Sequence, residues 1–164
     1  MTTQKSTGKG ISRRSKIIIA SIVILIVAIS SAVALIQLTS FHPVSLPVQQ
    51  VIVYEPVIVN ASTYAGYQFI IPEGVRSPEI YGNFALSNDS TGTIRVYVMD
   101  SGNYADWQNN RTSSFYYNSG QVNSAAIEQT LDAGKTYYLI FDNTLSTTPK
   151  NITTNIQYQY FPSQ

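Results

Sequence analysis

The distribution of apolar residues divides the chain into two unlike parts. The first is a run over residues 17–38 that carries no charge and has Gln37 as its only strongly polar member. As an α-helix it would be about 33 Å long at about 1.5 Å per residue, which matches the roughly 30 Å hydrocarbon core of a bilayer. Its serines can bond back to their own helix carbonyls. The pattern therefore predicts one transmembrane helix.

From Val51 onward the pattern changes to short runs rich in Val, Ile, Tyr, Phe and Thr, separated by clusters of turn-forming residues. In the last run, Ile152 and Ile156 fall on one face and Thr153 and Gln157 on the other. This period of two is typical of an antiparallel strand with one buried face. Short strands at such spacing predict two packed antiparallel sheets, an all-β sandwich. The expected elements are strands over residues 51–59, 64–71, 80–86, 94–99, 114–117, 121–131, 137–142 and 152–160, and a helical turn over 103–108.

The charges are sparse, 12% of the residues, and they are segregated along the chain. Five cations precede the apolar run, and the remaining residues hold five basic and nine acidic side chains. By the positive-inside rule, the N-terminus stays in the cytoplasm and everything after the run is exported. We therefore expect a single-pass protein of the cell membrane. Its predicted parts are a basic cytoplasmic tail (1–16), a transmembrane helix (17–38), a proline-containing spacer (39–50) and an extracytoplasmic β-sandwich domain (51–164).

Two sequence motifs indicate that the N-terminal segment could instead be cleaved. Ala32-Val33-Ala34 has the small-x-small pattern of a signal-peptide cleavage site, and cutting there would release a secreted domain. Lys9-Gly10-Ile11-Ser12 resembles the processing site of archaeal type IV pilins, which are cut after the glycine to expose a filament-forming helix. Arg13, Arg14 and Lys16 follow that site, and burying three cations in a filament core is costly. A retained anchor is therefore the leading interpretation.

The composition argues against several classes of function. The exported part is mildly acidic and its five cations are scattered, which does not suit nucleic-acid binding. Cysteine is absent, so a thiolate nucleophile, a disulfide framework and a thiolate metal site are excluded. The only histidine, His42, lies just past the apolar run beside Pro43, where a fixed catalytic geometry is hard to build. We expect no enzyme.

Aspartates at predicted strand ends are the remaining candidates for chemistry. Paired carboxylates could act as a glycosidase, but Asp is also an ordinary turn residue and nothing in the spacing selects a pair. With Asn103 and Asn143 they could supply oxygen ligands to calcium, although no loop has a dense D-x-D-x-D pattern. We expect neither a metal site nor a cofactor. The four aspartates are Asp100, Asp106, Asp132 and Asp142.

N-glycosylation is better supported by the sequence than glycosidase activity or calcium binding. Four N-x-S/T triplets lie on the exported side beside predicted turns, which agrees with the predicted topology. Such triplets also arise by chance in a chain rich in Asn, Ser and Thr. The candidate asparagines are Asn60, Asn88, Asn110 and Asn151.

Aromatic residues are abundant, with twelve tyrosines, six phenylalanines and one tryptophan. Tyr104, Trp107, Tyr116 and Tyr117 fall around one predicted loop. An exposed aromatic cluster rimmed by Asn and Gln can stack on sugar rings or anchor a protein interface. The alternative is that Trp107 closes one end of the sandwich core.

The stretches IRVYVMDSGNYADWQNN (94–110) and LDAGKTYYLIFDN (131–143) resemble prokaryotic envelope β-sandwich domains. The basic tail, the single anchor and the ectodomain rich in Ser, Thr and Asn are similar to the archaellum stator subunits of archaea. That resemblance implies an immunoglobulin-like sandwich and a surface-layer partner. The expected function is a non-enzymatic interaction domain of the cell envelope that anchors a surface appendage, holds another envelope or surface-layer protein, or forms a homodimer. A carbohydrate-binding module and a pilin-like filament subunit remain the alternatives.

Overall fold

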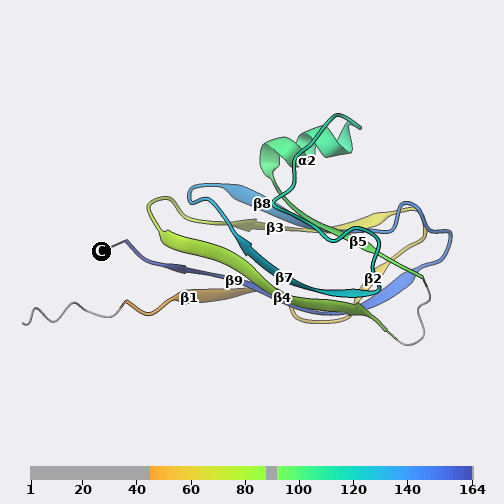
Figure 1. Ribbon diagram of the computed structural model, residues 1–164, viewed down its shortest axis with the longest axis horizontal. Coiled ribbons are helices and arrows are strands. Elements are labelled where there is room, and N and C mark those ends of the chain that lie inside the picture. Colours follow the sequence, from red (N-terminus) through yellow and green to blue (C-terminus); the bar gives the residue numbers. More distant parts are fainter. Residues whose placement is uncertain (1–44, 88–91, 164) are drawn as a thin grey trace, which may run out of the picture. The chain divides into compact units, whose positions relative to one another are not determined.

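The computed structural model describes residues 45–87 and 92–163, which belong to one compact unit that begins at Ser45 (Figure 1). The predicted transmembrane helix, both processing motifs, His42 and Asn88 lie outside the described residues. Within this part of the chain, no helix has the length and apolarity needed to cross a membrane. The elements are β1 (Val48–Val53), β2 (Val57–Val59), β3 (Tyr64–Ile70), β4 (Arg76–Leu86), β5 (Arg95–Asp100), α2 (Ser101–Gln108), β6 (Tyr117–Asn118), β7 (Ser124–Thr130), β8 (Thr136–Asp142) and β9 (Lys150–Phe161).

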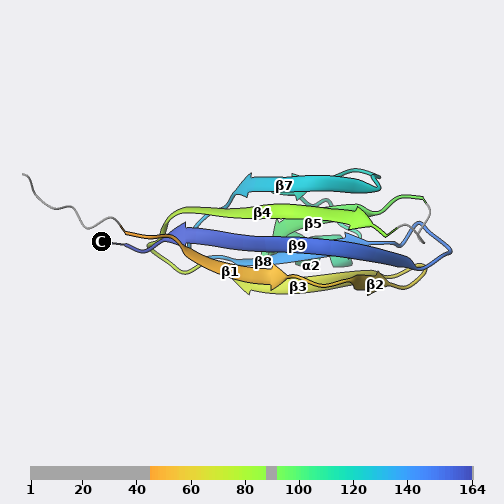
Figure 2. The same cartoon turned by 90° about the horizontal axis from the view of Figure 1, so that it is seen from below.

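The strands form two antiparallel sheets. Sheet A has the order β1-β9-β4-β7, with β2 also paired to β9, and sheet B has the order β3-β8-β5-β6. Figure 2 shows the strands of sheet A side by side, from β7 across β4 and β9 to β1. The prediction of an all-β domain with two antiparallel sheets is confirmed.

One hydrophobic core joins the inner faces of the two sheets. Phe84 of β4 meets Phe141 of β8 edge-on, with ring centroids 6.1 Å apart, and Phe69 of β3 stacks on Tyr158 of β9 at 5.2 Å. Each such side chain contributes about 1.5–3 kcal/mol when it leaves water. The buried positions of β9 alternate as its sequence predicts, with Ile152 and its alternate neighbours inward. The sandwich-like packing thus follows from the period-two pattern.

The strand order differs from the expected immunoglobulin-like connectivity. In the immunoglobulin fold the first two strands are neighbours in one sheet. Here β1 lies beside the last strand, β9, and β3 belongs to the opposite sheet. With β1 and β2 counted as one interrupted strand, this is the order of an eight-stranded jelly roll. The sequence pattern could not predict it, because periodicity determines which face of a strand is buried and not which strands are neighbours.

The single strand expected over residues 51–59 is two strands. Both β1 and β2 pair with β9, but the register shifts after Val51 and the ladder is interrupted near Pro56. Proline has no backbone N–H to donate to a ladder, which explains the interruption. The Thr154 hydroxyl donates to the Glu55 carbonyl oxygen at 2.7 Å and ties the interruption to β9. Because β1 begins at Val48, part of the expected spacer belongs to the sheet.

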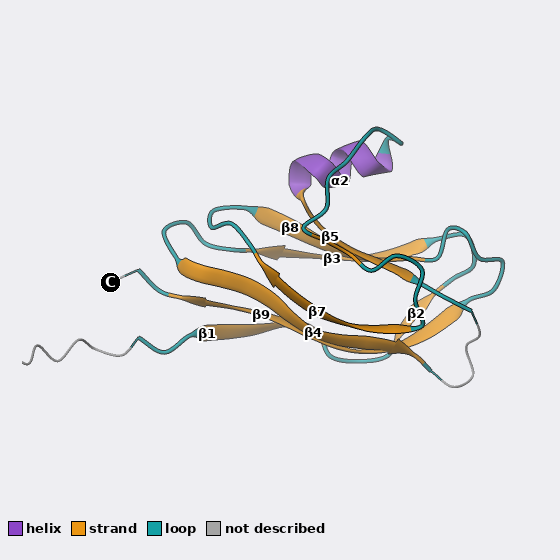
Figure 3. Cartoon of the chain, viewed as in Figure 1, coloured by secondary structure: helices purple, strands orange, loops and turns teal. Residues whose placement is uncertain are grey.

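Part of the outer face of sheet B lies beneath α2, the only helix of the described residues (Figure 3). The alternation in β5 predicts one buried face, yet every residue from Val96 to Met99 is buried. Tyr97, Met99 and Ile140 form a second, smaller cluster beneath α2 and the chain that follows it. Two of the four predicted aromatic residues, Tyr104 and Trp107, pack against this second cluster.

Candidate functional site: two cavities beside the Arg95–Asp142 ion pair

The helix α2 begins directly where β5 ends. Asp100 is its N-cap: the Asp100 Oδ1 atom accepts a hydrogen bond from the backbone N–H of Asn103 at 3.0 Å. A carboxylate at this position satisfies an orphan N–H and interacts favourably with the helix dipole. The helix that results presents Tyr104 and Trp107 to the second cluster on sheet B.

These two residues lie in a group of packed rings. Tyr104 stacks on Tyr138 of β8 at 4.0 Å between centroids, and Trp107 meets Tyr64 of β3 edge-on at 4.9 Å. The amide nitrogen of Gln108 donates to the hydroxyls of Tyr64, at 2.9 Å, and of Tyr104, at 2.8 Å. Burial, followed by the hydrogen bond with Tyr64, raises the pKa of Tyr104 to about 12. The ring group is therefore both packed and hydrogen-bonded.

Tyr116 and Tyr117 do not belong to this group. The Tyr116 hydroxyl donates to Asp132 Oδ2 at 2.5 Å, and its ring meets Tyr137 edge-on. The Tyr117 hydroxyl donates to the Ala126 carbonyl oxygen at 3.0 Å. Both tyrosines pack against the main core. The structure thus brings together two of the four predicted aromatic residues.

A cavity of about 530 Å³, here called the aromatic groove, opens beside Trp107. It combines two aromatic rings with polar and charged side chains from the end of α2 and the loop after it, from the start of β5, and from the end of β8 and the loop after it. The lining residues are Tyr64, Arg95, Trp107, Gln108, Asn110, Arg111, Asp142 and Thr144. The sequence analysis did not predict Tyr64 as part of this site, because Tyr64 and Trp107 are far apart along the chain.

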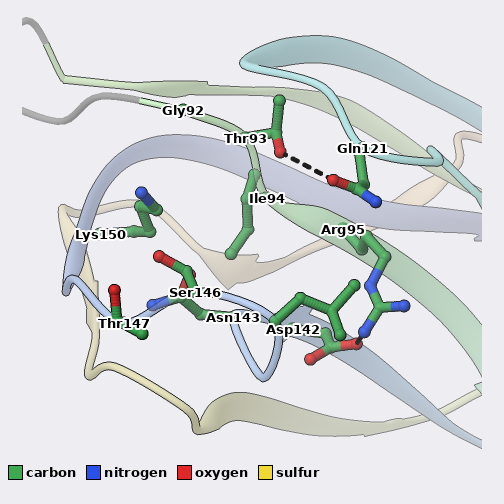
Figure 4. A pocket seen from close by; sticks show the side chains of 11 residues that line it. Gly92, Thr93, Ile94, Arg95, Gln121, Asp142, Asn143, Ser146, Thr147 and Lys150 are labelled. Carbon is green, nitrogen blue, oxygen red and sulfur yellow. Dashed lines mark hydrogen bonds and ion pairs between the residues drawn. The ribbon is translucent and has the colours of Figure 1, made fainter.

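A second cavity of about 310 Å³, the polar cavity, is lined mainly by hydroxyl, amide and charged side chains (Figure 4). The Thr93 hydroxyl donates to Gln121 Oε1 at 3.3 Å. Lys150 also lines this cavity, and its ammonium donates to the Thr148 hydroxyl at 3.2 Å. Arg95 and Asp142 line both cavities, so they stand between the two.

Asn143 organises the loop beside the polar cavity. Its Nδ2 group lies within hydrogen-bond distance of the carbonyl oxygens of Val59, Asn60 and Thr148. The side chain is thus turned toward protein carbonyls as a donor, whereas a calcium ligand would offer its oxygen. Among the described residues, no three His, Cys, Asp or Glu side chains gather closely enough to hold a metal ion.

Each of the four candidate aspartates makes an ion pair, and Asp100 and Asp132 share Lys135 as their partner. Asp142 pairs with Arg95, Asp106 with Arg111 at 3.3 Å, and Lys135 contacts Asp132 at 2.8 Å and Asp100 at 3.8 Å. The backbone hydrogen bond from Asn103 lowers the pKa of Asp100, and the Lys135 hydrogen bond lowers that of Asp132. A general acid needs the opposite shift.

Three of the four sequon asparagines are described. Asn60 is exposed directly after β2, and Asn110 is exposed just after α2 with a left-handed backbone (φ +53°). Asn151 lies within β9, opposite Ile58 of β2, and is half-buried. Asn60 and Asn110 are therefore the more accessible of these three acceptors.

Comparisons with known proteins find similarity to solved structures at low sequence identity. No protein-family description matches the chain, and no curated protein matches it. A solved structure of Bacillus endospore appendages, described as disulfide-linked pili, shares 13% identity with a TM-score of 0.44 and covers 73% of this chain and 91% of its own. The mitogen of Yersinia pseudotuberculosis shares 9% identity with a TM-score of 0.37 and covers 74% and 89%. Neither likeness is close enough to carry an argument about function, and neither supports the resemblance to archaellum stator subunits.

Proposed function

We propose that this chain is a membrane-anchored, non-enzymatic interaction domain of the cell envelope, which pairs with a second copy of itself through the edge formed by β1 and β2. The chemistry of that edge carries the proposal. Among the described strands, none pairs with its outer side. Such an edge exposes a row of backbone N–H and C=O groups that can accept another strand.

The register shift after Val51 and Pro56 interrupt the β1–β2 edge, so its continuous pairing surface is the first part of β1, which carries no charge. Glu55 is the only charged residue between positions 45 and 59, although charged side chains are the common device that keeps an edge strand alone. Four large hydrophobic side chains are between 61% and 77% exposed along this segment. They are Leu46, Val51, Tyr54 and Ile58. Their burial in an interface would release water from apolar surface.

A second copy suits this edge because two identical strands that pair antiparallel around a two-fold axis are self-complementary. The absence of charge in β1 means that the copies would not repel each other across the ladder. The opposite edge of sheet A, β7, carries Glu128 and small side chains instead. Since the two edges are unlike, the proposal favours a closed dimer over an open filament.

Two further observations support the remaining parts of the proposal. The apolar run 17–38 with its preceding cations has the length and charge flank of a retained anchor. The lowered pKa values of Asp100 and Asp132 suit carboxylates that remain charged, not a general acid of a hydrolase.

The dimer can be tested by cross-linking in membranes, because the chain has no cysteine of its own. Single cysteines would be placed on β1 as Gln49→Cys, Gln50→Cys and Val51→Cys, with Ala126→Cys on β7 as the matched control. We expect a disulfide-linked dimer from at least one β1 variant and none from the control. Adding Val51→Lys to a cross-linking Gln49→Cys or Gln50→Cys variant should abolish the dimer. Cross-links to a different protein would instead identify a heterologous partner.

The anchor needs a separate experiment. Thr147→Cys should react with a membrane-impermeant maleimide on intact cells, whereas Thr7→Cys should react only after lysis. The protein should resist carbonate extraction and require detergent.

Mass spectrometry of the native N-terminus distinguishes a retained anchor from the two processed forms. Cleavage after Gly10 indicates a pilin-like subunit, and cleavage after Ala34 indicates a secreted domain.

A further inference from the structure

The aromatic groove places ring surfaces beside hydrogen-bonding groups. Tyr64 is 39% exposed and meets the half-buried Trp107 edge-on, so part of each ring faces solvent. An aromatic side chain offers an apolar face and, in tyrosine, a polar tip. A pyranose sugar has the complementary form, because its C–H groups make an apolar face and its hydroxyls surround the ring.

The polar side chains of the groove are suited to hydroxyl groups. Gln108 is fixed by the two hydrogen bonds from its Nε2 to Tyr64 and Tyr104, so its amide is held in one orientation. Asn110 and Thr144 line the same groove and are exposed. Both Nε2 hydrogens of Gln108 are engaged, so Gln108 offers its Oε1 as an acceptor to a sugar hydroxyl. The Asn110 amide and the Thr144 hydroxyl can both donate and accept.

The charges of the groove cancel in pairs. Arg95 is neutralised by Asp142 and Arg111 by Asp106, so neither guanidinium offers an uncompensated charge to an anion. The volume of about 530 Å³ falls within the range of about 300–1,000 Å³ common to small-molecule sites. We infer that the aromatic groove binds a neutral pyranose sugar. This inference does not depend on the proposed dimer.

Two sources could supply that sugar. One is a glycan of another envelope molecule, and the other is an N-linked glycan on Asn110, which both begins a sequon and lines the groove. Protein made in a host without N-glycosylation separates them, because its groove is open to added sugars only.

Trp107 is the only tryptophan of the chain, so its fluorescence reports on the groove directly. Unglycosylated full-length chain in detergent micelles would be titrated with cellohexaose, chitohexaose, mannohexaose and, as the anionic comparison, oligogalacturonate. We expect a saturable change with at least one neutral probe and none with oligogalacturonate. Gln108→Ala and Tyr64→Leu should each weaken that binding by roughly threefold to tenfold, as for one lost hydrogen bond or ring contact.

Gln159→Ala on sheet A and the exposed Tyr54→Leu on its edge are the matched controls, and both should bind as the unmodified chain does. Gln108 is exposed, so its variant tests the groove even if Tyr64→Leu impairs folding. If no added sugar binds, glycosylated protein is compared with Asn110→Gln, and a shift of Trp107 emission assigns the groove to the chain's own glycan. The inference is overturned if neither comparison gives a signal, if only the anionic probe binds, or if the groove variants and controls bind alike.

Discussion

The Arg95 guanidinium and the Asp142 carboxylate meet at 2.5 Å, although they differ sharply in their access to water. Only 1% of the Asp142 side chain is exposed, against 26% for Arg95. The backbone N–H of Thr144 donates to the other carboxylate oxygen at 2.9 Å, and Arg95 also donates to the Thr144 hydroxyl at 3.1 Å. Asp142 is therefore a buried charge that depends on Arg95 for its compensation.

Removing Arg95 should be costly for this reason. Arg95→Ala leaves the Asp142 charge buried and unpaired, and we expect it to lower the free energy of unfolding by about 3 kcal/mol. Arg111→Ala is the matched control: its pair with Asp106 is exposed, so the expected loss is below about 1 kcal/mol. Urea unfolding in detergent micelles, followed by circular dichroism, measures both. Equal losses in the two variants would show that Asp142 does not rely on its partner.

Gly82 and Gly120 should differ in how much stability is lost when each is replaced by alanine. It lies within β4 at φ +142°, and an added Cβ would stand 2.1 Å from the Asn155 carbonyl oxygen of β9. Backbone atoms in the middle of a sheet cannot move aside, so Gly82→Ala should cost more than about 3 kcal/mol. At Gly120, φ is +64° and no atom lies within 4 Å of the added Cβ, so Gly120→Ala should cost about 1 kcal/mol. The same unfolding measurement ranks them, and a tolerated Gly82→Ala would contradict the register of β4 on β9.

Much of the fold could be predicted from the sequence because alternation reports directly on burial. The pattern of Ile152 and Ile156 places β9 on the core, and the structure confirms it. The pattern was less informative in β5, where Tyr97 and Met99 are buried on the outer face. A helix that covers the second face of a sheet removes the polar side that alternation relies on. The order of the strands could not be predicted, because it depends on contacts between strands that are distant along the chain.

The candidate site was predicted only in part, for a similar reason. Tyr104 and Trp107 lie three residues apart, which places them on one side of a helix, and the structure brings them together. Tyr64 and Arg95 reach the same groove from β3 and β5. Their membership follows from the pairing of both strands with β8, which a single sequence does not reveal.

The N-cap of α2 offers a test of how the aromatic rings are held in place. Asp100→Ala removes the acceptor for the Asn103 N–H and should destabilise the helix by about 1 kcal/mol. Asp100→Asn keeps a capping oxygen but loses the charge, so at pH 7 it should destabilise the helix less than Asp100→Ala does. The fluorescence of Trp107, on the same helix, measures the local effect. If both variants lose the helix equally, the charge of Asp100 and not its capping geometry is what matters.

Asp100 should also make the stability of the folded protein decrease at acid pH. The hydrogen bond from Asn103 holds the pKa of folded Asp100 below its ordinary value of 3.8. Its contribution to stability is therefore present above pH 3.8 and is lost as pH falls through the lower, folded value. Asp100→Asn should remove this part of the acid dependence while the cap persists. Thermal unfolding between pH 5 and pH 2, about the range in which carboxylates titrate, compares the two proteins.

At alkaline pH, ionisation of the buried tyrosines should be the main cause of lost stability. Desolvation by burial is the leading cause of a raised pKa in six of the twelve. These six are Tyr67, Tyr97, Tyr104, Tyr117, Tyr137 and Tyr158. Because their folded pKa lies above the ordinary value of 10.0, their contribution is fully present below pH 10.0 and is lost as pH rises through the folded values.

We therefore expect a cooperative alkaline unfolding transition in which these phenols ionise only as the sandwich opens. Tyrosinate absorbance and circular dichroism, recorded in one titration, should change together. Tyr97→Phe keeps the ring that stacks on Phe115 at 4.7 Å but removes a titrating hydroxyl, so the transition should move to higher pH. Complete ionisation of all twelve tyrosines with the β-sheet signal intact would mean that the buried rings exchange with solvent without unfolding, and the packing of the second cluster beneath α2 would then be wrong.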